Sequence, residues 1–117
     1  MIVRMPGCLV LAVKFFTKNQ IFVSLSNGLI ILYDTDSHRV LKIFPNKGAV
    51  IDCLKILNKN YLITAGIDSK TRMWSIKQEK LYAKFEVHKY ATQQILINDQ
   101  NLYSYGGHDL KLAKLEI

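Results

Sequence analysis

The sequence is poor in cysteine. Its 117 residues include only Cys8 and Cys53, which form no CxxC pair. This usage argues against a disulfide framework and against a cysteine zinc site. Two isolated cysteines are typical of reduced, buried thiols in an intracellular protein.

Long apolar runs are also missing. No stretch approaches the roughly 18 to 20 residues that a membrane span needs. The run Cys8–Val13 has six residues, which is shorter than the core of about 7 to 15 residues in a secretory signal peptide. The sequence contains no Asn-x-Ser/Thr sequon. We therefore expect a soluble, cytoplasmic protein with no membrane partner, and the nucleus remains an open alternative.

Motifs that carry chemistry are absent as well. There is no phosphate-binding glycine-rich loop, no HExxH motif and no nucleophile elbow. The nine acidic residues are dispersed along the chain, which does not suggest a carboxylate pair for acid and base catalysis. The sequence therefore predicts a protein that is not an enzyme and that has no cofactor and no metal site.

Basic residues, in contrast, are plentiful. The 16 Lys and Arg residues against 9 acidic ones give a net charge of +7, which favours acidic partners or nucleic acid. No block of five like charges occurs, so a solvated, lysine-rich surface explains the excess better than RNA binding. An RNA- or nucleoprotein-associated subunit is the alternative. It would use the basic residues expected on the outer strands, which are Arg39, Lys42, Lys77, Lys80 and Lys84.

The sequence repeats itself every 41 residues. The segments that align without a gap are Val13–Asp34, Leu54–Ser75 and Ile95–Glu116. One column of this alignment holds Asn27, Asp68 and Asp109, and another holds Tyr33, Trp74 and Leu115. A repeat of this length, built of short apolar runs, predicts an all-β protein made of β-propeller blades with four antiparallel strands each.

Short polar breaks divide each repeat into strand-sized runs. In the first repeat we expect strands at Leu9–Phe16, Ile21–Leu25, Leu29–Tyr33 and Val40–Phe44. In the second we expect Val50–Leu57, Tyr61–Ala65, Thr71–Ile76 and Leu81–Val87, and in the third Gln93–Ile97, Leu102–Tyr105 and Leu110–Leu115. The pair Asn27-Gly28 is a strong hairpin signal because both residues tolerate positive φ.

These runs divide the chain into about 2.8 blades. Residues 8–48 form blade one, 49–89 form blade two, 90–117 hold the first three strands of blade three, and 1–7 hold the end of a fourth strand around Ile2–Met5. Propellers close with about four to eight blades, so we expect an incomplete ring. A composite or homo-oligomeric ring and a truncated piece of a longer propeller explain this frame equally well.

The second repeat carries the closest family resemblance. The segment Tyr61–Trp74 resembles the core of a WD40 repeat, with Thr64, Asp68 and Trp74 at matching positions. In that family a His, a Ser or Thr, an Asp and a Trp form a hydrogen-bonded network within one blade. In the third repeat His88 and Asp109 match, while Tyr105 and Leu115 replace the hydroxyl and the Trp. In the first, Asn27 and Tyr33 stand for the Asp and the Trp, and Val23 replaces the hydroxyl.

The resemblance also implies a binding face and a function. The face bears the turns between second and third strands and the links that enter each first strand. Its candidate protein-binding residues are Ser26, Ile67 and His108 in the turns and Lys47, Lys89 and Tyr90 at the links. Ile67 is the leading candidate because an exposed apolar residue on such a rim can anchor a partner, although it can also fold over its own hairpin.

The resemblance therefore implies a non-catalytic protein-interaction scaffold within a larger assembly, whose partners are other protein chains. The alternatives are the RNA-associated subunit and a truncated gene product without independent function.

Overall fold

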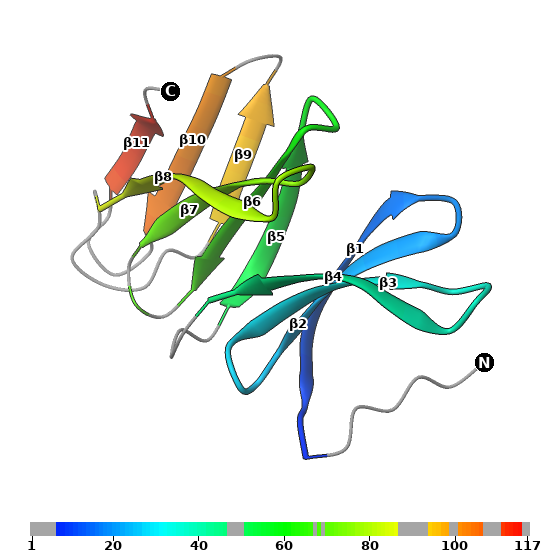
Figure 1. Ribbon diagram of the computed structural model, residues 1–117. Coiled ribbons are helices and arrows are strands. Elements are labelled where there is room, and N and C mark those ends of the chain that lie inside the picture. The colour runs from blue at the N-terminus through cyan, green and yellow to red at the C-terminus, as the bar shows by residue number, and fades with distance from the viewer. Residues whose placement is uncertain are drawn as a thin grey trace.

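The computed structural model describes residues 7–46, 51–66, 68, 70–86, 94–98, 101–106 and 111–115, and this part of the chain is all β (Figure 1). Sheet one consists of β1 (Val10–Thr17), β2 (Gln20–Leu25), β3 (Leu29–Asp34) and β4 (Arg39–Pro45). Sheet two consists of β5 (Ile51–Leu57), β6 (Tyr61–Gly66), β7 (Thr71–Ser75) and β8 (Lys80–Phe85). Sheet three consists of β9 (Gln94–Asn98), β10 (Asn101–Gly106) and β11 (Lys111–Leu115).

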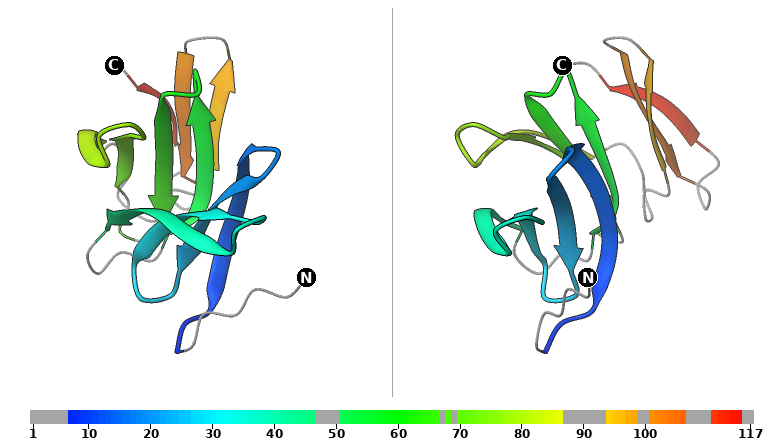
Figure 2. Two further views of the ribbon diagram at one scale, coloured as in Figure 1. Left: turned by 45° about the vertical axis from the view of Figure 1, so that its right-hand side comes forward. Right: turned by 90° about the vertical axis from the view of Figure 1, so that its right-hand side faces the viewer.

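Each sheet is an antiparallel meander in which strands follow one another in chain order. The three sheets stack side by side, with the first strands β1, β5 and β9 toward one side (Figure 2). The described strands form no closed ring. The prediction of four-stranded propeller blades in an incomplete ring is therefore confirmed, and the strands agree with the predicted runs to within one or two residues at nearly every end. The predicted strand at Ile2–Met5 lies outside the described residues.

The sequence repeat extends to backbone irregularities. Register shifts occur between Val10 and Ala12 in sheet one and between Ile51 and Cys53 in sheet two, which are 41 positions apart. The turns that lead into β4 and β8 contain positive-φ residues at equivalent positions, His38 with φ 58° and Glu79 with φ 56°. Side chains other than glycine adopt this conformation rarely. Two unlike residues in the same unusual conformation indicate that the repeated sheet geometry imposes it.

The main core lies between sheets one and two. Phe22, Ile30 and Phe44 of sheet one and Leu62 of sheet two are fully buried there. The ring of Phe44 packs edge-on against Phe22, at 5.8 Å between centroids, and against Trp74 of sheet two, at 6.1 Å. Edge-to-face aromatic pairs contribute about 0.5–1.5 kcal/mol beyond the area they bury. Phe44 therefore joins the two sheets.

A second core lies between sheets two and three. Ile63 and Met73 project from the other face of sheet two and are fully buried against Ile95 and Leu102 of sheet three. Apolar residues thus alternate between the two faces of sheet two, and both faces are covered. This pattern is typical of a sheet in the interior of a stack.

Polar contacts also join sheets one and two. The Ser24 hydroxyl is fully buried and donates to the carbonyl oxygen of Ile51 at 2.6 Å. On the outer side, the backbone N–H of Ile43 in β4 donates to the Glu79 carboxylate at 3.3 Å. This contact satisfies a donor on the exposed edge of sheet one, where unpaired groups favour aggregation.

Within the described residues, no helix is long and apolar enough to cross a membrane.

The aromatic contact at Phe44 generates a stability prediction. We expect F44A to lower the free energy of unfolding by about 3–5 kcal/mol, because it leaves a cavity between two sheets. The control is L41A in the same strand, where the side chain is 42% exposed and the expected loss is below about 1 kcal/mol. Urea denaturation followed by circular dichroism measures both. Equal losses would contradict the assignment of this core.

The buried hydroxyl of Thr71 leads to a prediction of increased stability. Its oxygen is buried and has no hydrogen-bond partner among the described residues, and Ile30 occupies the equivalent position in sheet one. A buried unpaired hydroxyl costs about 1–3 kcal/mol, so T71V should raise the free energy of unfolding by about 1 kcal/mol. T35V is the matched control, since the Thr35 hydroxyl donates to Asn19. A loss of stability in T71V would show that the hydroxyl has a partner.

Candidate interaction surfaces

Thr64 and Trp74 are joined inside sheet two. The indole Nε1–H of Trp74 donates to the Thr64 hydroxyl oxygen at 3.1 Å, and both side chains are buried. Leu62 pairs with Trp74 and Thr64 pairs with Arg72 across β6 and β7, so the bond connects neighbouring rows of one face. A buried donor and acceptor satisfy each other here, and the bond holds the indole in a fixed orientation.

Asp68 lies in the turn between β6 and β7 and accepts two contacts. One carboxylate oxygen accepts the backbone N–H of Lys70 at 3.2 Å, and the other is 2.8 Å from Nη2 of Arg72. Both partners stabilise the turn rather than the Thr64–Trp74 pair. Asp68 and the Thr64–Trp74 pair are thus two separate local clusters, linked through Arg72 on the same strand as Trp74.

The equivalent residues of sheet one play similar local roles. The Asn27 side-chain oxygen accepts the backbone N–H of Leu29 at 3.0 Å, two residues ahead, as Asp68 does with Lys70. The Tyr33 hydroxyl lies 3.3 Å from Nδ1 of His38 in the turn that follows. Asn27 and Asp68 therefore share an Asx-type turn contact.

Sheet three corrects one prediction from the sequence. There Ser104 pairs with Ile95, as Thr64 pairs with Leu54 in sheet two, so Ser104 occupies the hydroxyl position. The assignment of Tyr105 to that position is wrong. The cause is the first turn, because three residues separate β5 from β6 and only two separate β9 from β10. The gap-free alignment is therefore out of register by one residue in β10.

Ser104 is fully buried, and the repeat spacing did not predict it as the residue equivalent to Thr64. The polar run Asn98–Asn101 gave no sign of the shift, because its two outer residues belong to β9 and β10 and only the strand pairing shows the shorter turn. His88 and Asp109 lie outside the described residues, as does the side chain of Leu115.

Most of the predicted binding rim also lies outside the described residues. This applies to Ile67, His108, Lys47, Lys89 and Tyr90. Ser26 is described and exposed, and its hydroxyl accepts the backbone N–H of Leu9 at 2.9 Å while its own N–H donates to the Leu9 carbonyl. Ser26 therefore joins its turn to the segment that enters β1.

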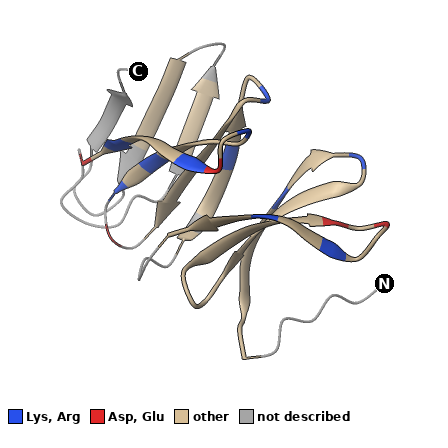
Figure 3. Cartoon of the chain, in the orientation of Figure 1, with Lys and Arg blue, Asp and Glu red and all other residues tan. Residues whose placement is uncertain are grey.

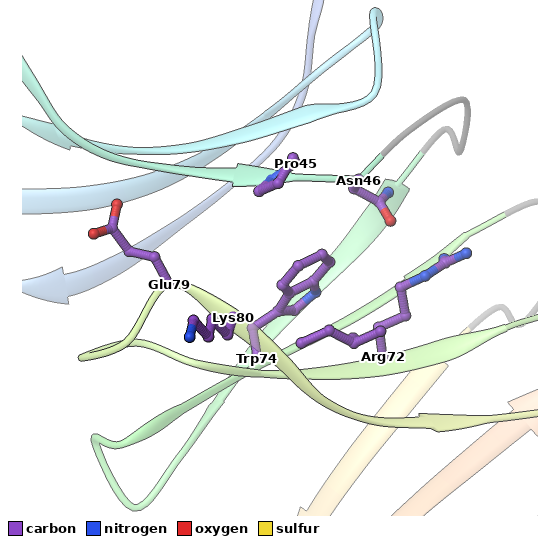
Figure 4. A pocket seen from close by; sticks show the side chains of 7 residues that line it. Pro45, Asn46, Arg72, Trp74, Glu79 and Lys80 are labelled. Carbon is purple, nitrogen blue, oxygen red and sulfur yellow. The ribbon is translucent and has the colours of Figure 1, made fainter.

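A groove of about 460 Å³ lies between sheets one and two, on the side of β4 and β8 (Figure 4). It is lined by Pro45, Asn46, Arg72, Trp74, Glu79, Lys80 and Leu81. Figure 4 shows Pro45 and Asn46 facing the indole of Trp74 across the groove, with Arg72 and Glu79 at opposite ends. Nη1 of Arg72 is buried there and has no hydrogen-bond partner in the part of the chain that the structure describes.

The residue types in this groove suit binding rather than catalysis. The lining offers an aromatic surface, an amide and two cationic side chains, with a single carboxylate at Glu79. It contains no histidine, no cysteine and no pair of carboxylates. Among the described residues, no group of three histidine, cysteine or acidic side chains is placed to hold a metal ion.

Known proteins share this arrangement of sheets. The WD40 β-propeller domain of Doa1 superposes with a TM-score of 0.82 at 18% identity, covering 91% of this chain and 36% of that one. The RRP9 WD40 repeats superpose with a TM-score of 0.77 at 16% identity, covering 96% and 40%. The three sheets have the fold of WD40 propeller blades. The resemblance to the WD40-repeat family is thereby confirmed.

The sequence comparison agrees with the structural one. An uncharacterised WD repeat-containing protein of Schizosaccharomyces pombe is 35% identical over 63 residues, which span 54% of this chain and 16% of that protein. No family model matches the sequence. The chain covers far less than two thirds of each of these three proteins.

The bond between Thr64 and Trp74 generates a prediction for a double-mutant cycle. T64V leaves the buried indole N–H without an acceptor, so we expect a loss of about 1–3 kcal/mol in the free energy of unfolding. In a W74F background the same substitution should cost about 1 kcal/mol less, because no donor remains. Thermal and urea unfolding of the four proteins measure the coupling. Additive losses would contradict an energetic role for the bond.

Proposed function

We propose that this chain acts as a non-catalytic interaction scaffold, as part of a WD40 propeller within a larger protein assembly. One observation carries the proposal: the face of sheet one that points away from sheet two is apolar, and its margins along β1 and β4 are exposed. We call this the outer face of sheet one. It is made of Val13, Phe15, Ile21, Val23, Ile31, Tyr33 and Ile43. Val13, Phe15 and Ile43 are exposed, whereas Val23, Ile31 and Tyr33 are buried.

The exposure of this face can be compared with that of the equivalent face of sheet two. Leu54 and Ile56 of β5 occupy the positions equivalent to Val13 and Phe15 of β1. Leu54 is 6% exposed and Ile56 packs against the same core, because sheet one covers them. Val13 and Phe15, in contrast, are 59% and 68% exposed. The same position in two copies of one blade is thus covered in one copy and open in the other.

This contrast indicates what covers the outer face. Contiguous exposed apolar surface on a soluble protein marks an interaction site. A surface shaped as the upstream side of a blade fits the downstream side of another blade, such as the one that sheet one presents with Phe22, Leu32 and Phe44. We therefore infer that a further blade packs on the exposed part of this face, and that for the purified chain a second copy or another polypeptide supplies it.

The basic outer strands support an RNA partner less well. Lys42 donates to the carbonyl oxygen of Ile76, and Lys84 lies 3.5 Å from Glu86. These contacts involve two of the five basic residues predicted on the outer strands. Binding to RNA remains the second candidate, and the steep loss of affinity with salt that phosphate contacts cause would identify it.

The protein-binding rim stays a prediction within this proposal. Ile67 remains its leading residue, with Ser26, His108, Lys47, Lys89 and Tyr90 around it. A rim of this kind binds partners only when the neighbouring blades hold it in place. Covering the outer face is therefore a precondition for the scaffold function.

The native mass of the purified chain tests the proposal. We expect a mass at or above twice the 13.4 kDa of one chain, with β-rich circular dichroism. V13D/F15D places two charges on the outer face and should reduce the mass to that of one chain, because burying an unpaired carboxylate is costly.

The matched control is L41D/L81D, which introduces the same charges at side chains that are 42% and 46% exposed on the outer strands β4 and β8. It should leave the mass unchanged. A compact, stable monomer of the unmodified chain would contradict the proposed assembly, as would an unchanged mass for V13D/F15D.

A further inference from the structure

A second groove, with a different chemistry, lies between sheets one and two. It has a volume of about 410 Å³ and lies on the side of the turns that join β5 to β6 and β7 to β8. Its lining consists of Phe16, Lys42, Lys59, Asn60, Tyr61, Ser75, Ile76 and Lys77. We call this the lysine groove. Three of its residues are cationic and none is acidic.

Lys42 is a fixed cation in this groove. Its Nζ donates to the carbonyl oxygen of Ile76 at 2.8 Å and lies 3.4 Å from that of Lys77, so two backbone groups of sheet two hold a side chain of sheet one. An ammonium group has three donors, and two carbonyl contacts leave one donor for a further acceptor. A positioned ammonium group loses less conformational freedom on binding than a mobile one.

Lys59 and Lys77 add two charges that no described carboxylate neutralises. The ion pairs in the described part of the chain use Lys70, Lys84 and Arg72 with Asp68 and Glu86, and these lie along β7, β8 and their flanking segments. The side chains of Lys59 and Lys77 take part in none of them. Figure 3 shows Lys and Arg positions on both four-stranded sheets, with fewer Asp and Glu positions.

The groove walls favour carboxylates over nucleic acid. A single-stranded nucleic acid needs open aromatic faces for its bases and a basic track for its phosphates. Phe16 already packs on Phe22 at 5.3 Å between ring centroids, and Tyr61 packs on Tyr82 at 5.1 Å. The three ammonium groups share one short groove, and the polar side chains of Asn60 and Ser75 lie beside them.

We infer that the lysine groove binds an acidic peptide segment of a partner protein, whose carboxylates contact Lys42, Lys59 and Lys77. This inference rests on the proposed scaffold function and names the chemistry of one partner. The groove differs from the predicted rim, because it lies among first-to-second and third-to-fourth strand turns. The rim lies among second-to-third strand turns and the links. The scaffold would therefore hold partners on two opposite sides.

Fluorescence anisotropy with a labelled oligoglutamate peptide tests the inference. The unmodified chain should bind this peptide and should not bind an oligoglutamine peptide of the same length. K59Q/K77Q removes two groove charges and leaves Lys42 and its carbonyl contacts in place. We expect this variant to weaken oligoglutamate binding about tenfold, since each exposed ion pair contributes modestly.

The control is K70Q/K84Q, which removes the same net charge from the turn between β6 and β7 and from β8, at positions outside the groove lining. It should change the affinity by less than about twofold, because screened charges at a distance contribute little. Equal weakening in both double variants would overturn the inference in favour of net charge alone. Absence of binding by the unmodified chain would overturn it too.

A third arm separates the peptide from a nucleic acid. A labelled oligouridine of the same charge should bind more weakly than oligoglutamate and should respond equally to the two double variants. Tighter oligouridine binding that K59Q/K77Q selectively abolishes would assign the groove to RNA instead. Native mass measured on each variant distinguishes this inference from the proposed function, because K59Q/K77Q should leave the assembly intact.

Discussion

The apolar contact between sheets one and two is the interaction on which the rest of the structure depends. Phe44 lies at its centre and touches an aromatic ring of its own sheet and Trp74 of the next. A single four-stranded sheet has two faces and little core of its own, so it needs a neighbour to bury either face. Both grooves also form at this junction, and their shapes therefore follow from how closely the two sheets pack.

Equivalent faces of successive sheets can pack in the same way, because the sequence repeats. The face that sheet two turns toward sheet one is equivalent to the outer face of sheet one, and the alternation of apolar residues is the same in both. Each blade therefore has an upstream and a downstream side. Stability in such arrays depends on intrinsic blade stability and on the contacts between neighbours. The buried Ser24 contact and the Glu79 contact at the edge of β4 add polar specificity to this apolar stacking.

Much of the fold follows from the sequence, since strand length and strand order depend on local patterns. Apolar runs and polar breaks predict the strands, and the 41-residue period predicts that sheets one and two are equivalent. The exception is Ser104, because a turn that is one residue shorter shifts β10 against its neighbours. A one-residue shift reverses the face on which every side chain of a strand lies. Periodicity alone does not detect it.

The binding sites were harder to predict for a different reason. The lysine groove combines Phe16 and Lys42 of sheet one with Lys59 and Lys77 of sheet two, and nothing in their spacing brings them together. Arg72 likewise pairs with Asp68 and lines the first groove beside Trp74, and its place in the sequence alone did not indicate either contact. Sites between repeats depend on how sheets stack. The network within one repeat depends on local spacing, and Thr64 and Trp74 could therefore be named from the sequence.

Thiol accessibility tests the central claim most directly. In a C8A/C53A background, F15C places a thiol on the outer face of sheet one, and I56C places one at the equivalent, covered position of sheet two. K18C provides an exposed reference in a turn. With the protein in its native assembly, we predict that a maleimide reagent modifies F15C as slowly as I56C, and both far more slowly than K18C. Modification of F15C at the rate of K18C, with I56C still protected, would show that nothing covers the outer face and would contradict the account.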